Sequence, residues 1–128
     1  MTTKKWTRSS PALIQKFQTF MENFENIENK KMFGYPCCFL NGNMFTGLHE
    51  ENWIIRLSEP DREEMTKKYN TSLFEPMPGR VMKEYVILPS LILSDFKIFH
   101  EWIDRSITFV SFLPLKEIKR PIKRKNKV

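Results

Sequence analysis

The sequence predicts an α+β fold with the chain order helix–strand–strand–strand–helix–strand–strand–helix, in which a five-stranded, mainly antiparallel sheet is packed with helices. Two observations predict this class. Apolar residues recur at helical spacing over residues 13–27 and 96–110, near the two ends of the chain. Between them, short apolar runs are separated by turn dipeptides such as Asn41-Gly42 and Pro78-Gly79, as in antiparallel sheets.

The chain of 128 residues has a formal net charge of +6, and this charge is concentrated at one end. Residues 115–128 carry seven Lys or Arg and one acid, so residues 1–114 hold equal numbers of basic and acidic residues. We therefore expect three parts: a flexible lead-in at 1–9, one α+β domain at 10–114, and a disordered basic tail at 115–128. A domain that is basic throughout, as many nucleic-acid-binding domains are, is disfavoured.

The first helix is predicted to begin at Ser10-Pro11, because serine is a good N-cap and proline is tolerated in the first turn. An apolar stripe extends the helix to about Asn26. The stripe consists of Leu13, Phe17, Phe20, Met21, Phe24 and Ile27.

Residues 31–40 are predicted to form the first strand, which joins the second through a two-residue turn at Asn41-Gly42. This turn would pair Leu40 with Asn43, Phe39 with Met44, and Cys37 with Thr46. One face of the hairpin then carries Tyr35, Cys37, Phe39, Met44 and Leu48, and the other carries Cys38, Leu40 and Phe45. Both faces are apolar, so alternation alone does not say which one faces the core.

The remaining elements follow from the same signals. Residues 53–57 alternate as a third strand, and Ser58 followed by Pro60 and Asp61 opens a helix that ends near Tyr69. Residues 73–76 and 81–88 are predicted strands on either side of a Pro-Gly loop. Ser94 is the expected N-cap of a long final helix that Pro114 ends.

The chain shows no membrane span and no secretory signal, and a reducing cytoplasm fits best. The adjacent Cys37 and Cys38 are two small apolar residues of a strand or, less favoured, a vicinal thiol sensor. His49 and His100 lie in different elements, so we expect no metal site. No nucleophile elbow and no glycine-rich phosphate loop occurs. We therefore expect no cofactor, no catalytic residues and no enzyme activity.

Basic and aromatic residues are interleaved near the loop between the last two predicted strands. Arg80 and Lys83 lie close to Phe74 and Tyr85, and Arg56 of the third strand could join them. One interpretation is an anion or nucleic-acid patch. The alternative, which we favour, is a tight turn with ordinary outward-facing charges.

The basic tail is the second candidate contact for nucleic acid. Its cations are Lys116, Lys119, Arg120, Lys123, Arg124, Lys125 and Lys127. Such a run can contact phosphates, and since it contains no aromatic residue the contact would be weak and blind to sequence. The alternative is a tail that binds nothing.

Two segments together resemble the N-terminal domain of the TfoX/Sxy family. Residues 31–45 resemble its Met-Phe-Gly-Gly hairpin, and residues 74–86 resemble its second signature, which is followed by a helix bearing a tryptophan, here Trp102. In order and spacing the similarity covers roughly residues 13–113. The residues that match the motifs are Met32, Phe33, Gly34, Phe45, Phe74, Pro76, Met82 and Tyr85.

The resemblance implies an α+β domain of a cytoplasmic bacterial protein, related to regulators of natural competence that act with the cyclic-AMP receptor protein on DNA. Full-length competence regulators carry a second, C-terminal helical domain, and we expect a stand-alone N-terminal domain here. The chain also departs from the motif at Tyr35-Pro36, where the family's second hairpin glycine would stand. The resemblance implies no catalytic residue, and it implies that most of the matching residues are structural.

Our leading interpretation is a non-enzymatic regulatory or protein-interaction domain, linked to transcription or competence, whose tail touches nucleic acid. Its partner is an unknown protein, and a second copy of the chain is one candidate. The rival interpretation is a protein–protein adaptor with no role in nucleic-acid binding. A small enzyme would regain support if Tyr85, Arg80 and either His49 or His100 shared a deep pocket.

Overall fold

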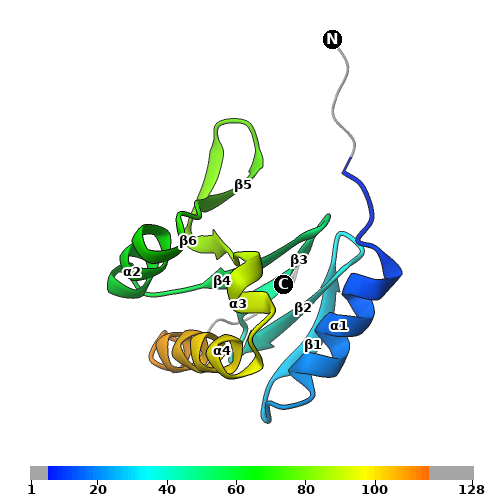
Figure 1. The fold of residues 1–128 in the computed structure, drawn as a ribbon. Coiled ribbons are helices and arrows are strands. Elements are labelled where there is room, and N and C mark those ends of the chain that lie inside the picture. The colour runs from blue at the N-terminus through cyan, green and yellow to red at the C-terminus, as the bar shows by residue number, and fades with distance from the viewer. Residues whose placement is uncertain (1–5, 116–128) are drawn as a thin grey trace, which may run out of the picture.

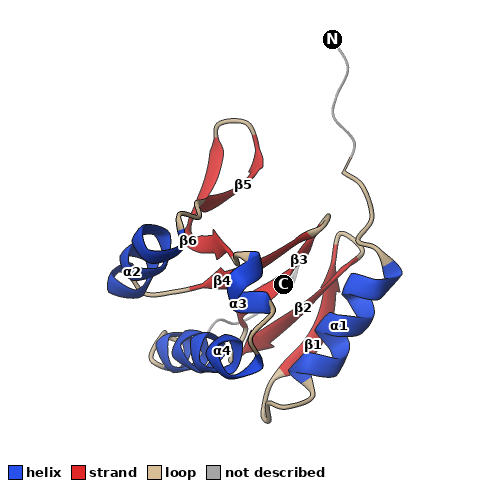
Figure 2. Ribbon diagram, viewed as in Figure 1, coloured by secondary structure: helices blue, strands red, loops and turns tan. Residues whose placement is uncertain are grey.

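A computed structural model describes residues 6–115 as one antiparallel sheet of six strands, accompanied by four helices (Figures 1 and 2). The strands lie in the order β1-β2-β3-β4-β6-β5. The elements are α1 (Pro11–Met21), β1 (Glu28–Met32), β2 (Tyr35–Leu40), β3 (Asn43–His49), β4 (Asn52–Arg56), α2 (Glu59–Tyr69), β5 (Leu73–Met77), β6 (Arg80–Ile87), α3 (Ser90–Leu93) and α4 (Phe96–Ser111). The predicted α+β class is confirmed.

Helices α1, α3 and α4 pack on one face of the sheet (Figure 1). Phe20 of α1 stacks on Phe99 of α4 at a centroid separation of 4.0 Å, and both rings contact the buried Trp53 of β4. Ser106 of α4 donates its hydroxyl to the carbonyl of Arg56 at 2.5 Å, which ties the helix to the end of β4. This face holds the hydrophobic core.

Six strands, not five, make up the sheet, and the prediction was wrong at residues 28–40. That stretch contains two strands joined by a two-residue turn at Phe33-Gly34, where φ is +55° and +85°. Met32 therefore pairs with Tyr35 across the turn. Strand β1 shows no apolar alternation because it is the outermost strand and every one of its residues is exposed.

The predicted hairpin at Asn41-Gly42 is confirmed, with positive φ at both turn residues and with the pairs Leu40–Asn43 and Phe39–Met44. The predicted pairing of Cys37 with Thr46 is wrong. A bulge between Cys38 and Phe39 shifts the register, so that Cys37 faces Gly47. Because of the extra residue at the bulge, the side chain of His49 lies on the same face of the sheet as that of Cys37.

The structure has four helices, not the three predicted, because the four residues of α3 are too few to show a helical repeat of apolar residues in the sequence. The boundaries of the three predicted helices follow the sequence signals with two differences. Helix α1 ends at Met21, and Phe24 and Ile27 contact the core from the loop that follows. Helix α4 is capped by Asp95, whose side chain accepts the backbone N–H of Ile98 at 3.1 Å. The predicted cap, Ser94, instead follows the short helix α3. Helix α2 begins after Ser58 and ends at Tyr69, as predicted.

Two further expectations concern parts of the chain at its ends. Residues 1–5 and 116–128 lie outside the described part of the structure, so the prediction of a disordered basic tail concerns residues that are not described, apart from the exposed Leu115. Within residues 6–115, no helix is long and apolar enough to cross a membrane.

Candidate functional site

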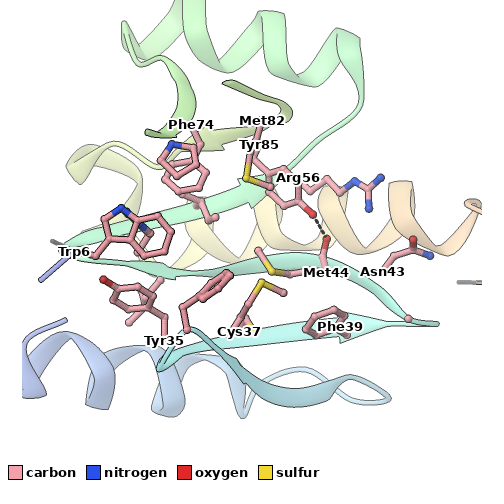
Figure 3. A pocket seen from close by; sticks show the side chains of 17 residues that line it. Trp6, Tyr35, Cys37, Phe39, Asn43, Met44, Arg56, Phe74, Met82 and Tyr85 are labelled. Atoms are coloured by element: carbon pink, nitrogen blue, oxygen red, sulfur yellow. Dashed lines mark hydrogen bonds between the residues drawn. The ribbon is translucent and has the colours of Figure 1, made fainter. Parts of the chain in front are cut away.

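The face of the sheet opposite α1 and α4 contains a partly enclosed pocket of about 260 Å³ (Figure 3). Its walls come from β2 and β3 on one side and from the β5–β6 hairpin on the other. Because β2 and β5 are not neighbours in the sheet, their meeting at one pocket shows that the sheet bends around this face. Six of the eight residues that match the family motifs line the pocket: Met32, Phe33, Phe74, Pro76, Met82 and Tyr85.

The other two motif residues have structural places. Phe45 is fully buried on the helix-covered face, and Gly34 supplies the positive φ of the β1–β2 turn. The sequence interpretation that most motif residues are structural therefore fits these two residues directly. The remaining six lie around one cavity, which gives their side chains a surface that a ligand could reach.

One end of the pocket is an aromatic cluster centred on His49. Its ring lies 4.6 Å from Trp6, 5.0 Å from Phe74 and 5.1 Å from Tyr35, measured between centroids. Trp6 also contacts Phe33 of the β1–β2 turn edge to face at 5.5 Å. These contacts join the two edges of the bent sheet through side chains.

Trp6 is held by residues 6–10, which we call the N-terminal strap. The backbone N–H of Thr7 donates to the Glu50 carboxylate at 2.9 Å, and that of Ser10 donates to the Glu51 carboxylate at 2.6 Å. The Tyr35 hydroxyl donates to the carbonyl of Thr7. The polar sequence of the strap predicts a flexible lead-in. In the structure, the strap instead contacts the β3–β4 turn, and Trp6 lines the pocket.

Polar groups close the other end of the pocket. Arg56 forms an ion pair with Glu84 at 2.7 Å, and its guanidinium lies 5.7 Å from the centroid of the Tyr85 ring. The Tyr85 hydroxyl donates to the carbonyl of Met44 at 2.8 Å, a bond between β6 and β3 that Figure 3 shows across the cavity. Burial raises the pKa of Tyr85 above its usual value, although the neighbouring Arg56 lowers it, so the phenol is neutral at physiological pH.

The two cysteines point to opposite faces of β2, as adjacent strand residues do. Cys37 lines the pocket, whereas Cys38 belongs to the core. Burial raises the pKa of the Cys38 thiol to about 12, and burial also raises that of Cys37, although the nearby Lys30 acts in the opposite direction. Both thiols are therefore protonated and weak nucleophiles, which favours two small strand residues over a thiol sensor.

The structure does not gather the candidate cations of the folded domain into one patch with exposed aromatic rings. Arg80 and Lys83 of β6 are exposed and do not line the pocket, whereas Arg56 is half-buried and paired with Glu84. Phe74, their expected aromatic partner, is buried at 5% exposure. The seven tail cations lie outside the described residues.

The residues that an enzyme or a metal centre would need are similarly dispersed. Tyr85 and His49 line the pocket, but Arg80 does not, and His100 lies on α4, where it contacts Asp104 at 3.1 Å. Over residues 6–115, no group of three His, Cys, Asp or Glu side chains is arranged to hold a metal ion.

The Met-Phe-Gly turn and the 74–85 hairpin thus lie around one pocket. The sequence profile of the TfoX N-terminal domain matches residues 19–110. The chain belongs to this family. A comparison with curated proteins gives no match. The matched range of this TfoX N-terminal domain includes every residue that lines the pocket except Trp6. Trp6 and the rest of the strap precede that range.

Ten of the 17 residues that line the pocket are not among the site residues predicted from the sequence, and Trp6, Met44 and His49 are three of them. A tryptophan in an otherwise polar lead-in is a usable signal, because so large an apolar side chain is seldom left in water. Strand alternation puts Met44 on the correct hairpin face together with Tyr35 and Cys37, but it does not indicate what occupies that face. His49 reaches the pocket through the bulge in β3, for which the sequence offers no clear signal.

Proposed function

We propose that this TfoX N-terminal domain is a non-enzymatic regulatory domain that acts by binding, and that the pocket on the open face of its sheet is the binding site. One observation carries the proposal: six of the eight family-motif residues, which lie far apart in the sequence, line the same cavity. A set of residues needed only for the core would be expected on the helix-covered face, where Phe45 lies.

The chemistry of the lining supports binding rather than catalysis. The Cys37 thiol and the Tyr85 phenol both have raised pKa values, so neither is activated as a nucleophile or base. Arg56 is held by Glu84, and the Tyr85 hydroxyl is used to join two strands. These groups stabilise the walls of the cavity.

A role in transcriptional or competence regulation follows, in this proposal, from membership of the family. Contact with nucleic acid would come from the seven cations of residues 116–127, since residues 1–114 carry equal numbers of basic and acidic residues. Binding through such a run of positive charges depends on phosphate and therefore weakens steeply with salt.

A titration against duplex DNA of two unrelated sequences tests this part of the proposal. The full chain is compared with a variant in which the seven tail cations are replaced by Gln, and with R80Q/K83Q as the matched control on the β5–β6 hairpin. We expect equal affinity for both duplexes and a salt dependence whose slope falls by about 0.9 for each phosphate that the altered tail no longer neutralises. An unchanged slope in the tail variant would contradict binding of DNA by the tail.

A protein–protein adaptor without nucleic-acid contact is the second candidate. Phe33 at the mouth of the pocket is 77% exposed and Met32 beside it is 40% exposed, an apolar rim of the kind that partner proteins cover. Under this candidate, capture of a partner survives nuclease and high salt and is reduced by F33A. The control F112A removes a similarly exposed ring just after the end of α4 and leaves capture unchanged.

A further inference from the structure

We infer that the pocket binds a neutral, largely apolar small molecule with a ring system, and that the N-terminal strap closes over it through Trp6. The inference rests on the proposed function, since it names the class of ligand that the same site would take. It assigns a role to residues 6–10, which lie outside the range matched by the family.

The size of the cavity selects a small molecule. At about 260 Å³ the pocket is slightly below the range of 300–1,000 Å³ typical of sites for drug-sized ligands. A helix about 10 Å across would not enter it. The walls are preformed, because Tyr35, Ile54 and Phe74 are all at most 6% exposed and are fixed by packing.

The composition of the walls selects an apolar ring. Aromatic side chains line the cavity from both edges of the sheet, and rings attract one another in edge-to-face and offset arrangements. Met32, Met44 and Met82 complete the lining. Because methionine is flexible and polarizable, these three side chains can adjust to a ring without movement of the strands.

The charges select a neutral ligand. Arg56 is the one lining residue among those described that carries a permanent charge, and Glu84 balances it at 2.7 Å. An anion would have to compete with Glu84 for the guanidinium, and a cation would meet the positive side of the pair. An uncharged ligand with a hydrogen-bond acceptor directed towards Arg56 requires neither change.

The strap is built so that it can open separately from the sheet. It is attached by hydrogen bonds to the β3–β4 turn and by one from the hydroxyl of Tyr35, and Trp6 packs only at the edge of the core cluster. Trp6 lies between His49 and the exposed Phe33, so its departure would uncover the aromatic end of the pocket. A ligand bound beneath the indole would be shielded from water.

A fluorescence titration with a matched pair of probes tests the ligand class. N-phenyl-naphthylamine is neutral, and anilinonaphthalene sulfonate carries the same rings with one negative charge. We expect the neutral probe to bind the full chain saturably at one site, and roughly tenfold or more tightly than the sulfonate, because burial of a charge without a new partner is costly. Tighter binding of the sulfonate, or no saturable binding of the neutral probe, would overturn the inference.

Two variants locate the bound probe and test the strap. W6A removes the cover and should weaken binding of the neutral probe by roughly tenfold, since the indole no longer packs on the bound rings. M44W fills the cavity from β3 and should abolish binding. F112A, which removes an exposed ring that does not line the pocket, is the control and should bind as the unaltered chain does. Thermal unfolding verifies that each variant is folded.

W6A and M44W test separate parts of the inference, so one variant still gives a result if the other is unstable. Trp6 lies outside the sheet and the helices, so W6A should fold whether or not the cavity is occupied. Undiminished binding by W6A overturns the role of the strap, and undiminished binding by a folded M44W overturns the site. If the neutral probe does not bind, the results of the partner capture and of the DNA titration are unaffected. The proposed function and this inference can therefore fail separately.

Discussion

Cys37 and Cys38 show how one position along a strand changes the environment of a side chain. Cys37 faces the pocket and Cys38 faces the core, where burial raises its pKa to about 12. Strand β1 places Lys30 opposite Cys37, but burial outweighs the effect of this cation on the pKa of the thiol. Burial therefore decides the state of both thiols.

The thiols give a prediction with a defined sign. Because the folded pKa of Cys38 is above the ordinary value of 9.0, folding favours the neutral thiol, and this contribution to stability is complete below pH 9. The free energy of unfolding should fall between about pH 9 and pH 12, with a smaller slope in C38A. At pH 8 a thiol reagent should react much more slowly with the folded chain than with the chain in urea. Equal rates in the two states would contradict the assigned burial.

Tyr85 provides a second test at the scale of one residue. Its hydroxyl donates to the Met44 carbonyl and so joins β6 to β3 across the pocket. Y85F should lower the free energy of unfolding by about 1 kcal/mol, the usual worth of such a bond, as measured by urea denaturation. The matched control is Y69F on α2, whose hydroxyl bonds to no other described residue and whose removal should change stability little. A similar decrease in both variants would count against the bond.

At the scale of the element, local chemistry predicted some segments well and others poorly. The Asn41-Gly42 hairpin and helix α2 follow from turn and capping residues within a few positions of each other. Strand β1 could not be found in this way, because Glu28–Met32 is exposed throughout and pairs only on one side. The turn after it places Phe33 at φ +55°, a conformation that an aromatic residue seldom adopts.

The N-terminal strap leads to a prediction about an element. The Glu51 carboxylate accepts two hydrogen bonds from Ser10, one from the backbone N–H at 2.6 Å and one from the side-chain hydroxyl at 3.1 Å. Removal of this carboxylate in E51A should cost about 1–3 kcal/mol of local stability, because hydrogen bonds to charged groups are stronger than average. Trypsin should then cleave after the exposed Arg8 roughly tenfold faster than in the unaltered chain.

Two controls accompany the cleavage measurement. E63A removes an exposed carboxylate of α2 and should leave the rate at Arg8 unchanged. Cleavage after Arg80, on the β5–β6 hairpin, serves as a reference within the same chain and should be the same in all three proteins. Faster cleavage at both arginines in E51A would indicate general destabilisation and would contradict a separate strap.

For the whole molecule, the two apolar faces of the β2–β3 hairpin have different occupants. The face of Cys38 and Phe45 is covered by helices, and the face of Tyr35, Cys37 and Met44 lines the pocket. The sequence showed that both faces needed cover. It could not show that one of them would form a cavity, because the cavity depends on the bending of a six-stranded sheet and on a strap more than forty residues away along the chain.

The two ends of the described chain also meet the pocket. Trp6 closes the aromatic end, and Asn43, which lines the other end, donates its side-chain amide to the carbonyl of Pro114 at 3.1 Å. The basic residues that account for the net charge of +6 follow directly after Pro114 in the sequence. Pro114, which bonds to the pocket-lining Asn43, thus stands two positions before Lys116, the first cation of the basic tail, in the sequence.

The central claim, that the family-motif residues form a binding pocket, is tested most directly by NMR of the methionine methyl groups during titration with N-phenyl-naphthylamine. Met32, Met44 and Met82 line the pocket, whereas Met21 and Met65 are buried on the side of the helices. We predict that the methyl signals of Met44 and Met82 shift along one binding curve while those of Met21 and Met65 stay in place. Shifts confined to Met21 and Met65, or no shift at Met44 and Met82 when the probe is bound, would contradict the account.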